Sequence, residues 1–243
     1  MNALPENTER LLHELDAEPL CDEFILAGGT ALALRLAHRS SEDLDFVFSA
    51  ERLPKIRIEK ILRNLEARHT VKPMVSTAEQ QDWENAGMDL LDYHRDYSVD
   101  NVKVTFFTPD ERKLAAAIRA ESGISGLTRI RVADLDTLFA MKAVTLNRRL
   151  VERDLFDLKL LIEEHGYSME AILRLADEHG YTADGVKQRI INAQRRLDDP
   201  GLKPMMANPP TFDQLKAYFV HQIDRAEQAA AEAAFSTPTP GKD

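Results

Sequence analysis

The sequence has a single cysteine, Cys21, among its 243 residues. One cysteine excludes an intrachain disulfide and a cysteine-rich metal site. Cys21 stands between Leu20 and Asp22 with no cation beside it to activate the thiol. We therefore expect this side chain to pack in the interior and not to act as a nucleophile.

Long hydrophobic runs are also missing. The apolar stretches are far shorter than the roughly 20 residues that cross a bilayer, and residues 1–20 lack the basic flank and apolar core of a signal peptide. We therefore expect a cytoplasmic protein that does not enter a membrane. With 44% hydrophobic and 30% charged residues, the chain should fold around a sizeable core, in one domain or two lobes.

Acidic residues outnumber lysine and arginine by 41 to 31, and the resulting formal net charge of −10 argues at first against a nucleic-acid partner. The distribution of charge weakens that argument. Residues 1–30 and residues 79–100 each carry seven acids and one arginine, whereas residues 111–153 carry nine lysines or arginines and five acids. A basic face on an acidic protein is equally compatible with RNA and with a nucleoside triphosphate alone.

The most informative stretch is Phe24–Phe48, FILAGGTALALRLAHRSSEDLDFVF. Its apolar opening, Phe24–Ala27, predicts a short buried strand that passes through Gly28, Gly29 and Thr30 into a helix. Glycines at such a junction let a phosphate approach the helix N-terminus, where free N–H groups and the helix dipole favour anions. The junction therefore predicts a phosphate-binding loop.

A second strand is expected over residues 43–48, and it carries Asp43 and Asp45. Strand side chains alternate with a period of two, so these carboxylates share one face while Leu44 and Phe46 point into a core. Two carboxylates so placed can share a divalent metal ion. Taken alone, the pair fits the solvated face of an ordinary strand equally well, and the phosphate-binding loop upstream favours nucleotide chemistry.

Two glycines, a spacer of thirteen residues and an Asp-x-Asp pair resemble the nucleotidyltransferases of the polymerase-β-like superfamily. The segment GGTALAL followed by RSSEDLDF resembles more narrowly the AbiEii/AbiGii toxin family of bacterial toxin–antitoxin and phage-defence systems. The resemblance implies an α+β fold, in which a mixed β-sheet with helices forms an N-terminal nucleotidyltransferase lobe and an all-helical lobe follows. It also implies one or two Mg²⁺ ions at Asp43 and Asp45.

The residue pattern changes from period two to the helical period after Pro109. We expect a catalytic lobe over residues 1–110, a helical lobe that completes the active site over residues 111–235, and a disordered tail over residues 236–243. Further strands are expected over residues 71–76, 89–97 and 99–107, a polar loop over residues 77–87, and helices over residues 6–19, 30–37, 135–146, 152–164 and 212–234.

Lys142 occupies an apolar position on the helix predicted from Leu135 to Leu146. A lysine on that face either extends its amine to solvent or meets an anion. The family resemblance favours the anion, because the toxin family carries a lysine on this helix, then an arginine and an acidic segment. Here those positions are matched by Lys142, Arg148 or Arg149, Arg153, Asp154 and Asp157.

Asp154 and Asp157 lie three residues apart and should share a helix face. Asp154 could simply complement the positive N-terminus of its helix. Asp157 lies beside Leu158 on a face that should be buried. A buried carboxylate needs a cation, and either Lys142 or a metal ion would serve.

Many members of the superfamily carry a third carboxylate on a later strand, which helps to hold the metal and acts as a base. The strand predicted over residues 99–107 offers Thr105 at that position. Asp100 could substitute only in a different register. The base could instead come from Asp154 or Asp157.

The resemblance implies a metal-dependent toxin that transfers a nucleotidyl group from an NTP to an acceptor hydroxyl, with the tRNA 3′ end as acceptor and an antitoxin as partner. The catalytic candidates are Asp43, Asp45, Lys142, Asp154 and Asp157. The nucleotide-binding candidates are Gly28, Gly29, Thr30, Arg39, Ser41, Lys142 and Arg148. Two alternatives stay open: a non-catalytic module that binds a nucleotide or a protein, and phosphoryl transfer to a cationic protein or antibiotic.

Overall fold

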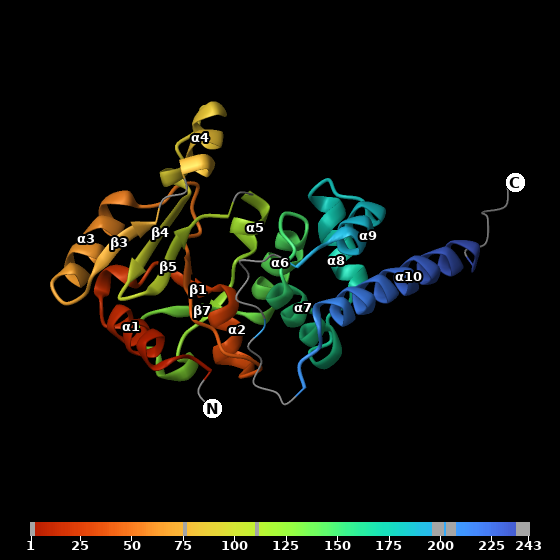
Figure 1. Cartoon of the computed structure of the whole chain (residues 1–243), viewed down its shortest axis with the longest axis horizontal. Helices are drawn as coiled ribbons and strands as arrows, with labels where there is room; N and C mark the ends of the chain where they lie inside the picture. The colour runs from red at the N-terminus through yellow and green to blue at the C-terminus, as the bar shows by residue number, and fades with distance from the viewer. Residues whose placement is uncertain (1–2, 75–76, 110–111, 196–201, 203–207, 237–243) are drawn as a thin grey trace, which may run out of the picture. The chain divides into compact units, whose positions relative to one another are not determined.

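The computed structural model describes residues 3–74, 77–109, 112–195, 202 and 208–236 (Figure 1). Its internal contacts divide the chain into two compact units. Unit 1 extends to Leu138, and unit 2 begins at Phe139. Each unit has buried apolar side chains of its own, for example Phe46 and Phe106 in unit 1 and Leu155 and Phe219 in unit 2.

Unit 1 is built on one seven-stranded mixed sheet with the strand order β3–β4–β5–β2–β1–β7–β6. The strands are β1 (Ile25–Ala27), β2 (Leu44–Val47), β3 (Val71–Met74), β4 (His94–Val99), β5 (Val102–Phe107), β6 (Ala120–Glu121) and β7 (Arg131–Ala133). The helices are α1 (Glu6–Asp16), α2 (Gly28–Leu36), α3 (Lys55–Glu66), α4 (Thr77–Asn85) and α5 (Arg112–Ala117), with short 3-10 turns η1 (Pro19–Cys21), η2 (Leu90–Asp92) and η3 (Ile124–Gly126).

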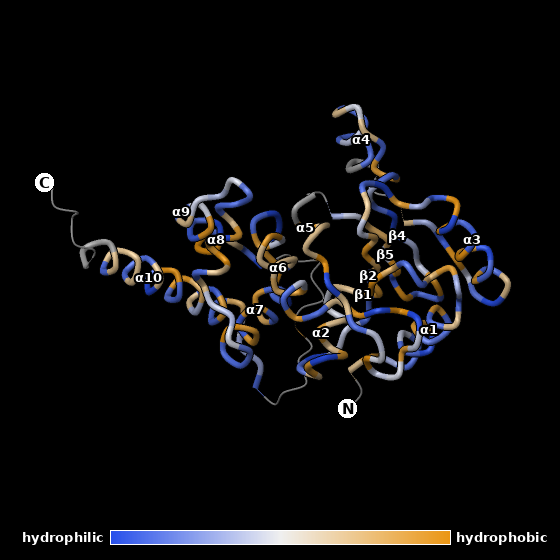
Figure 2. The backbone as a smooth tube through the Cα atoms, turned by 180° about the vertical axis from the view of Figure 1, so that it is seen from behind, coloured by the Kyte–Doolittle hydropathy of each residue, from blue (hydrophilic) through white to orange (hydrophobic). Residues whose placement is uncertain are grey.

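One face of the central strands forms the core of unit 1. Leu44 and Phe46 of β2 are buried, as the alternation predicts. The ring of Phe106 on β5 lies 5.6 Å from that of Phe46 and 5.0 Å from that of Phe24. This face is hydrophobic because every second residue of β2 and β5 is apolar, and Figure 2 shows the hydrophobic colour along these strands.

The expected lobe boundary near residue 110 is wrong, because the sheet continues beyond it. β7 pairs in parallel with β1, with Ile25 opposite Arg131, and β6 pairs with β7. Asp16 at the end of α1 also holds the segment before β7: its carboxylate accepts hydrogen bonds from the backbone N–H groups of residues 128–130 at 2.7–2.9 Å. The chain therefore stays in unit 1 until Leu138.

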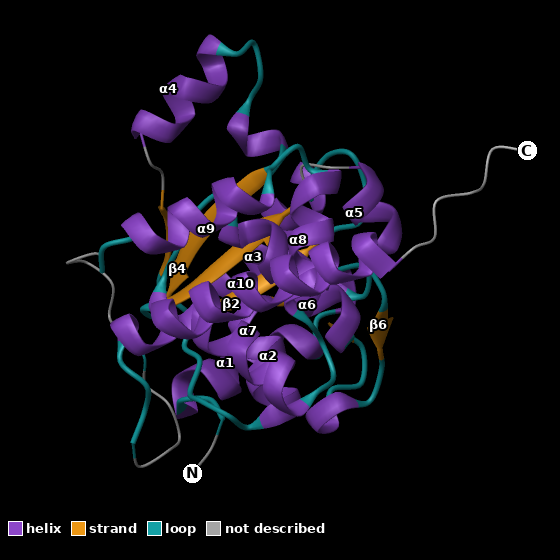
Figure 3. Ribbon diagram, turned by 90° about the vertical axis from the view of Figure 1, so that its right-hand side faces the viewer, coloured by secondary structure: helices purple, strands orange, loops and turns teal. Residues whose placement is uncertain are grey.

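Three local expectations in unit 1 are also corrected. The predicted loop 77–87 contains helix α4, which projects from the sheet (Figures 1 and 3). The strand predicted over residues 89–97 is instead η2 followed by β4, and β5 begins at Val102. Residues 75–76 of the first predicted strand lie outside the described residues. α4 was missed because it has no apolar stripe; its Trp83 ring packs at a tilt against the Tyr93 ring, with the ring centroids 5.2 Å apart.

Unit 2 is helical in the part that the structure describes. Its helices are α6 (Leu135–Leu146), which begins at the end of unit 1, α7 (Glu152–Glu164), α8 (Met169–Glu178), α9 (Ala183–Asn192) and α10 (Phe212–Ser236). α6 and α7 have the predicted bounds, and α10 packs against α7, α8 and α9. Of the predicted tail, Ser236 ends α10, and residues 237–243 lie outside the described residues.

The connections after α7 and α8 share one arrangement, a left-handed glycine followed by a Ser or Thr that caps the next helix. Gly166 and Gly180 adopt the left-handed conformation, with φ of 76° and 79°. The hydroxyls of Ser168 and Thr182 then accept hydrogen bonds from backbone N–H groups in the first turn of the next helix. No helix among the described residues is long and apolar enough to span a membrane.

Candidate active site

The first feature of the site is a close approach between Asp45 and the start of α2. Gly28 has a φ of +66°, and a Cβ atom placed on it would lie 2.1 Å from Asp45 Oδ2. Asp45 therefore occupies the space that any other residue at position 28 would fill. The glycine and the aspartate of the motif, seventeen positions apart in the sequence, form one unit in the structure.

Gly29 makes a second such approach possible. A Cβ atom on Gly29 would lie 2.5 Å from Arg39 Nη2 and 3.0 Å from Ser41 Oγ. Arg39 and Ser41 are both buried. Two predicted nucleotide-binding side chains thus meet at the N-terminus of α2, where free backbone N–H groups attract anions.

Thr30 fixes the segment that leads to the aspartates. Its side chain is fully buried. The Thr30 hydroxyl donates to the backbone carbonyl of Asp43 and is hydrogen-bonded to Ser41 Oγ at 3.0 Å. Thr30 therefore orients residues 41–43, and its predicted contact with a phosphate stays a prediction.

Asp43 and Asp45 are both half-buried at the start of β2: Asp43 directly precedes the strand and Asp45 lies within it. Oxygen atoms are the ligands that Mg²⁺ takes in proteins, and Mg²⁺ usually keeps several waters beside one or two carboxylates. Within the described ranges, no group of three or more His, Cys, Asp or Glu side chains could hold a metal ion. The carboxylate oxygens of Asp43 and Asp45 fit a hydrated divalent cation.

The second candidate group lies in unit 2, where Lys142 of α6 bridges two acids of α7. Lys142 Nζ lies 2.7 Å from Asp154 Oδ1 and 2.7 Å from Asp157 Oδ2. All three side chains are less than a tenth exposed. The cation that the buried carboxylates need is therefore Lys142, and its amine does not extend to solvent.

Electrostatics in this buried cluster favour the ionised form of Asp154. Burial acts to raise the Asp154 pKa, but the charges of Lys142 and Arg149 outweigh it and hold the pKa below its ordinary value. Arg149 Nε lies 3.4 Å from Asp154 Oδ2, yet that oxygen accepts no hydrogen bond. Arg149 therefore contributes charge more than directed bonding.

Arg148, the other arginine expected to neutralise a triphosphate, is exposed just beyond the end of α6. The catalytic and nucleotide-binding roles assigned to Lys142, Arg148, Asp154 and Asp157 stay predictions. What the structure adds is that Lys142 already forms ion pairs with both acids within unit 2.

β5 has the expected register, which places Thr105 at the position of the missing third carboxylate. The β4–β5 hairpin also brings in Asp96, a residue that the sequence did not single out. Thr105 lies opposite Asp45 on β2 and opposite Asp96 on β4, and its hydroxyl donates to Asp96 Oδ1 at 2.8 Å. Asp100 instead lies in the turn between the strands, with a φ of 47°, and its Oδ2 pairs with His69 Nδ1 at 2.8 Å. Asp100 is therefore a turn residue that does not replace Thr105.

Cys21 has the packing role that the sequence predicts. Its side chain is buried. Burial, with further contributions from Glu18, Asp22 and Asp16, raises the pKa of the Cys21 thiol to about 12. A thiol with such a pKa stays protonated at neutral pH and is a poor nucleophile.

Comparison with known proteins identifies the family. The family described as "Nucleotidyl transferase AbiEii toxin, Type IV TA system" matches residues 10–235. The uncharacterized protein aq_aa25 of Aquifex aeolicus (strain VF5) is 27% identical over 175 residues, which cover 72% of this chain and 75% of that protein.

Among solved structures, the fold is similar to that of MenT4, a nucleotidyltransferase toxin from Mycobacterium tuberculosis H37Rv. The TM-score is 0.51 at 13% sequence identity, and the match covers 87% of this chain and 80% of MenT4. At this identity the likeness shows the fold alone. Since the family match spans nearly the whole chain and includes the glycine and aspartate motifs, the chain belongs to the AbiEii family of nucleotidyl transferase toxins.

Proposed function

We propose that the protein transfers a nucleotidyl group from a nucleoside triphosphate to an acceptor hydroxyl in an Mg²⁺-dependent reaction. The observation that carries the proposal is the fit of the Asp45 carboxylate into the space left by Gly28 at the N-terminus of α2. This arrangement brings metal-binding oxygens next to a backbone that attracts phosphate.

In the proposed reaction the acceptor hydroxyl gives up its proton to solvent and its oxygen bonds to the α-phosphorus. The bond between the α-phosphorus and its bridging oxygen to the β-phosphate breaks, and pyrophosphate leaves. The backbone N–H groups at the start of α2 bind phosphate oxygens, and Arg39 supplies positive charge beside Gly29. Thr30 holds the segment of Asp43 in place through the Asp43 carbonyl. A bound Mg²⁺ supplies charge neutralisation of the phosphates, and Asp43 and Asp45 would hold it.

The acceptor that the family resemblance implies is the 3′ end of tRNA, extended so that aminoacylation is blocked. Such a toxin would act in the cytoplasm and would be controlled by an antitoxin, in a toxin–antitoxin or phage-defence system. The basic residues of segment 111–153 are compatible with an RNA acceptor.

The test is to incubate the purified protein with total tRNA and each labelled NTP in turn, in parallel with Asp45→Ala. Asp82→Ala is the matched control, because Asp82 is an exposed residue of α4. We expect one or more NTPs to label the RNA with the wild type and with Asp82→Ala, and no label above background with Asp45→Ala. Equal labelling by the wild type and Asp45→Ala would refute the proposal.

A binding module without catalysis is the second candidate, because no cluster of three potential metal-binding side chains occurs among the described residues. Expression in a bacterial host separates the two. Growth inhibition that Asp43→Ala abolishes supports catalysis, whereas inhibition that survives Asp43→Ala supports binding. For phosphoryl transfer, the third candidate, mass spectrometry of the modified acceptor would find a phosphate in place of a nucleotide.

A further inference from the structure

Three polar side chains lie in one row across the sheet of unit 1. Asp45 on β2 pairs with Thr105 on β5, and Thr105 pairs with Asp96 on β4. Neighbouring strands lie about 4.8 Å apart, and residues opposite one another present their side chains on the same face. Thr105 therefore stands on the metal-binding face directly beside Asp45, with Asp96 on its other side.

The Thr105 hydroxyl has a defined orientation. Its Oγ1 donates to Asp96 Oδ1 at 2.8 Å, and the side chain is 4% exposed. A hydroxyl has one proton and two lone pairs. Because the proton is directed to Asp96, the Thr105 oxygen can act only as an acceptor or a ligand toward its remaining neighbours.

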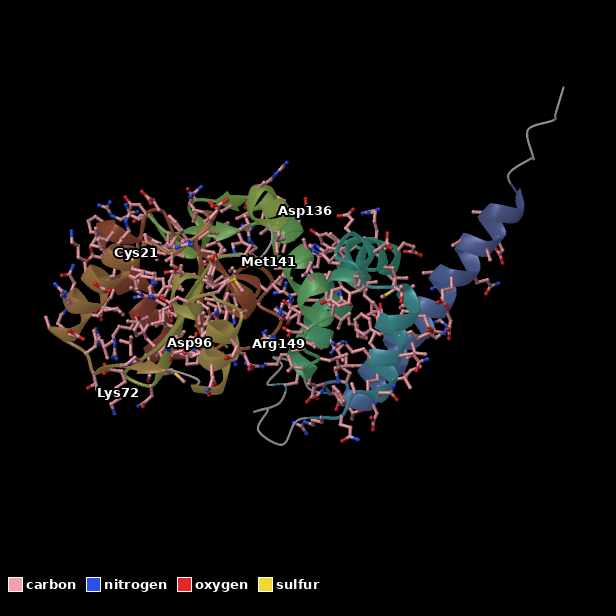
Figure 4. All side chains as sticks on the ribbon, turned by 90° about the horizontal axis from the view of Figure 1, so that it is seen from above. Cys21, Lys72, Asp96, Asp136, Met141 and Arg149 are labelled. Carbon is pink, nitrogen blue, oxygen red and sulfur yellow. The ribbon has the colours of Figure 1, made fainter. Side chains whose placement is uncertain are left out.

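Asp96 is held in place as an anion. Lys103 Nζ lies 2.8 Å from its Oδ2, and His94 Nε2 lies 2.9 Å from its Oδ1. An ionised carboxylate only accepts hydrogen bonds, so Thr105 must be the donor of the pair. Figure 4 labels Asp96 among the side chains of unit 1.

We infer that Thr105, oriented by Asp96, supplies the third protein oxygen of the divalent-cation site formed by Asp43 and Asp45. The inference rests on the proposed function, since it completes the metal site of that function. Hydroxyl oxygens of serine and threonine bind Mg²⁺ in other nucleotide-binding sites. The Thr105 hydroxyl oxygen, beside Asp45 in the sheet, therefore takes the ligand position that a third carboxylate has in many members of the superfamily. Asp96 acts through Thr105 and is a positioning residue.

Equilibrium binding of Mn²⁺, followed by electron paramagnetic resonance without nucleotide, tests this without relying on activity. Thr105→Val keeps the side-chain shape and removes the oxygen, and Asp96→Ala removes the acceptor while the partly exposed Lys103 and His94 turn to solvent. Loss of an oriented ligand or its partner costs about 10- to 100-fold in metal affinity. We expect each variant to bind Mn²⁺ about tenfold more weakly, and Thr105→Ser to keep wild-type affinity.

The double variant decides how Asp96 acts. If Asp96 acts through Thr105, then Thr105→Val with Asp96→Ala binds Mn²⁺ no more weakly than Thr105→Val alone. Asp100→Asn, in the turn of the same hairpin, is the control and should bind as the wild type does. Wild-type affinity of Thr105→Val, or a further loss in the double variant, would overturn the inference.

The labelling assay on the same proteins separates this failure from failure of the proposed function. If RNA labelling still depends on Asp45 while Thr105→Val binds Mn²⁺ normally, the function stands and the role of Thr105 is lost. If the wild type binds Mn²⁺ no better than Asp45→Asn, there is no cation site at Asp45 for Thr105 to complete, and the inference is overturned whatever the labelling assay gives.

Discussion

The two aspartate pairs of the molecule, one in each unit, have opposite surroundings. Asp43 and Asp45 of unit 1 are half-buried, and Asp45 lies against the glycine backbone at the start of α2. Asp154 and Asp157 of unit 2 are almost fully buried, and both contact Lys142 at 2.7 Å. The residue type is the same, but solvent stabilises the negative charge of the pair in unit 1, whereas Lys142 stabilises that of the pair in unit 2.

This difference separates activity from stability. A buried carboxylate without a cation is costly, so breaking the ion cluster around Lys142 should destabilise unit 2. The pair in unit 1 lies at the edge of solvent, where hydration offsets the charge in the absence of a ligand. Substitutions should therefore harm activity most in unit 1 and stability most in unit 2.

The largest expected effect is on activity, from Asp45→Ala. Loss of the carboxylate that we propose to hold Mg²⁺ should lower the labelling rate by about a thousandfold, which corresponds to roughly 4 kcal/mol of transition-state stabilisation. Stability should change little, because Asp45 is not part of the hydrophobic core. Stopped-time labelling assays and urea denaturation measure the two effects. Loss of folding in Asp45→Ala would break the distinction between the units.

The next effect is on stability, from Lys142→Met. The substitution keeps the length of the side chain and leaves two buried carboxylates without their cation, which should cost about 3–5 kcal/mol of unfolding free energy. Arg174→Met, at an exposed position of α8, is the control in the same unit and should change stability by less than about 0.5 kcal/mol. Similar denaturation midpoints for both variants would show that the cluster does not stabilise unit 2.

Sequence reasoning succeeded where the signal was local. α6 and α7 have the predicted bounds, and the start of α6 carries a clear local signal. Asp134 before α6, for example, accepts a hydrogen bond from the Thr137 backbone N–H at 2.8 Å, as an N-cap does. The proximity of Gly28 to Asp45 was also predictable, since the family resemblance marks both residues.

The errors in unit 1 arose where the deciding contact was distant or absent. β7 is a strand because it pairs with β1, about a hundred residues earlier, and no local pattern shows that partner. α4 lacks an apolar stripe, so periodicity could not identify it. The boundary near residue 110 was misplaced because the pairing of β7 with β1 is distant in the sequence.

Asp96 could have been found. Asp100 and Asn101 both have positive φ, 47° and 68°, and form a two-residue hairpin turn. Such a turn sets the register of the strands on either side, which places Asp96 opposite Thr105. Counting outward from that turn in the sequence would have brought the acid and the hydroxyl together.

A smaller effect should follow from Gly28→Ala, and Gly126→Ala is its matched control. Both glycines have positive φ, +66° and +80°, so each substitution carries a backbone cost of about 1–2 kcal/mol. Only Gly28 has Asp45 in the space of the new Cβ atom; nothing lies within 4 Å of that position at Gly126. We expect Gly28→Ala to be the more destabilising of the two, and Mn²⁺ binding to weaken for Gly28→Ala alone. Equal Mn²⁺ affinities would show that the close approach does not shape the site.

The smallest effect concerns pH and again separates the units. His69 in unit 1 lies 2.8 Å from both Asp100 Oδ2 and Glu14 Oε2, and hydrogen bonds to these acids raise the His69 pKa above 6.5. A raised pKa in the folded state means that the stabilisation is complete below pH 6.5 and is lost as pH rises through the folded value.

The lowered pKa of Asp154 in unit 2 has the opposite sign, because its stabilisation is lost only as pH falls below the ordinary value of 3.8. Between pH 6 and 9, amide protection factors, which are corrected for the intrinsic rise of exchange with pH, should therefore fall around α1 and the β4–β5 turn, while those of α6 and α7 stay constant. His69→Gln should abolish the pH dependence in unit 1. A decline that persists in His69→Gln would assign it to another group, and a matching decline in α7 would show that the pH response does not distinguish the two units.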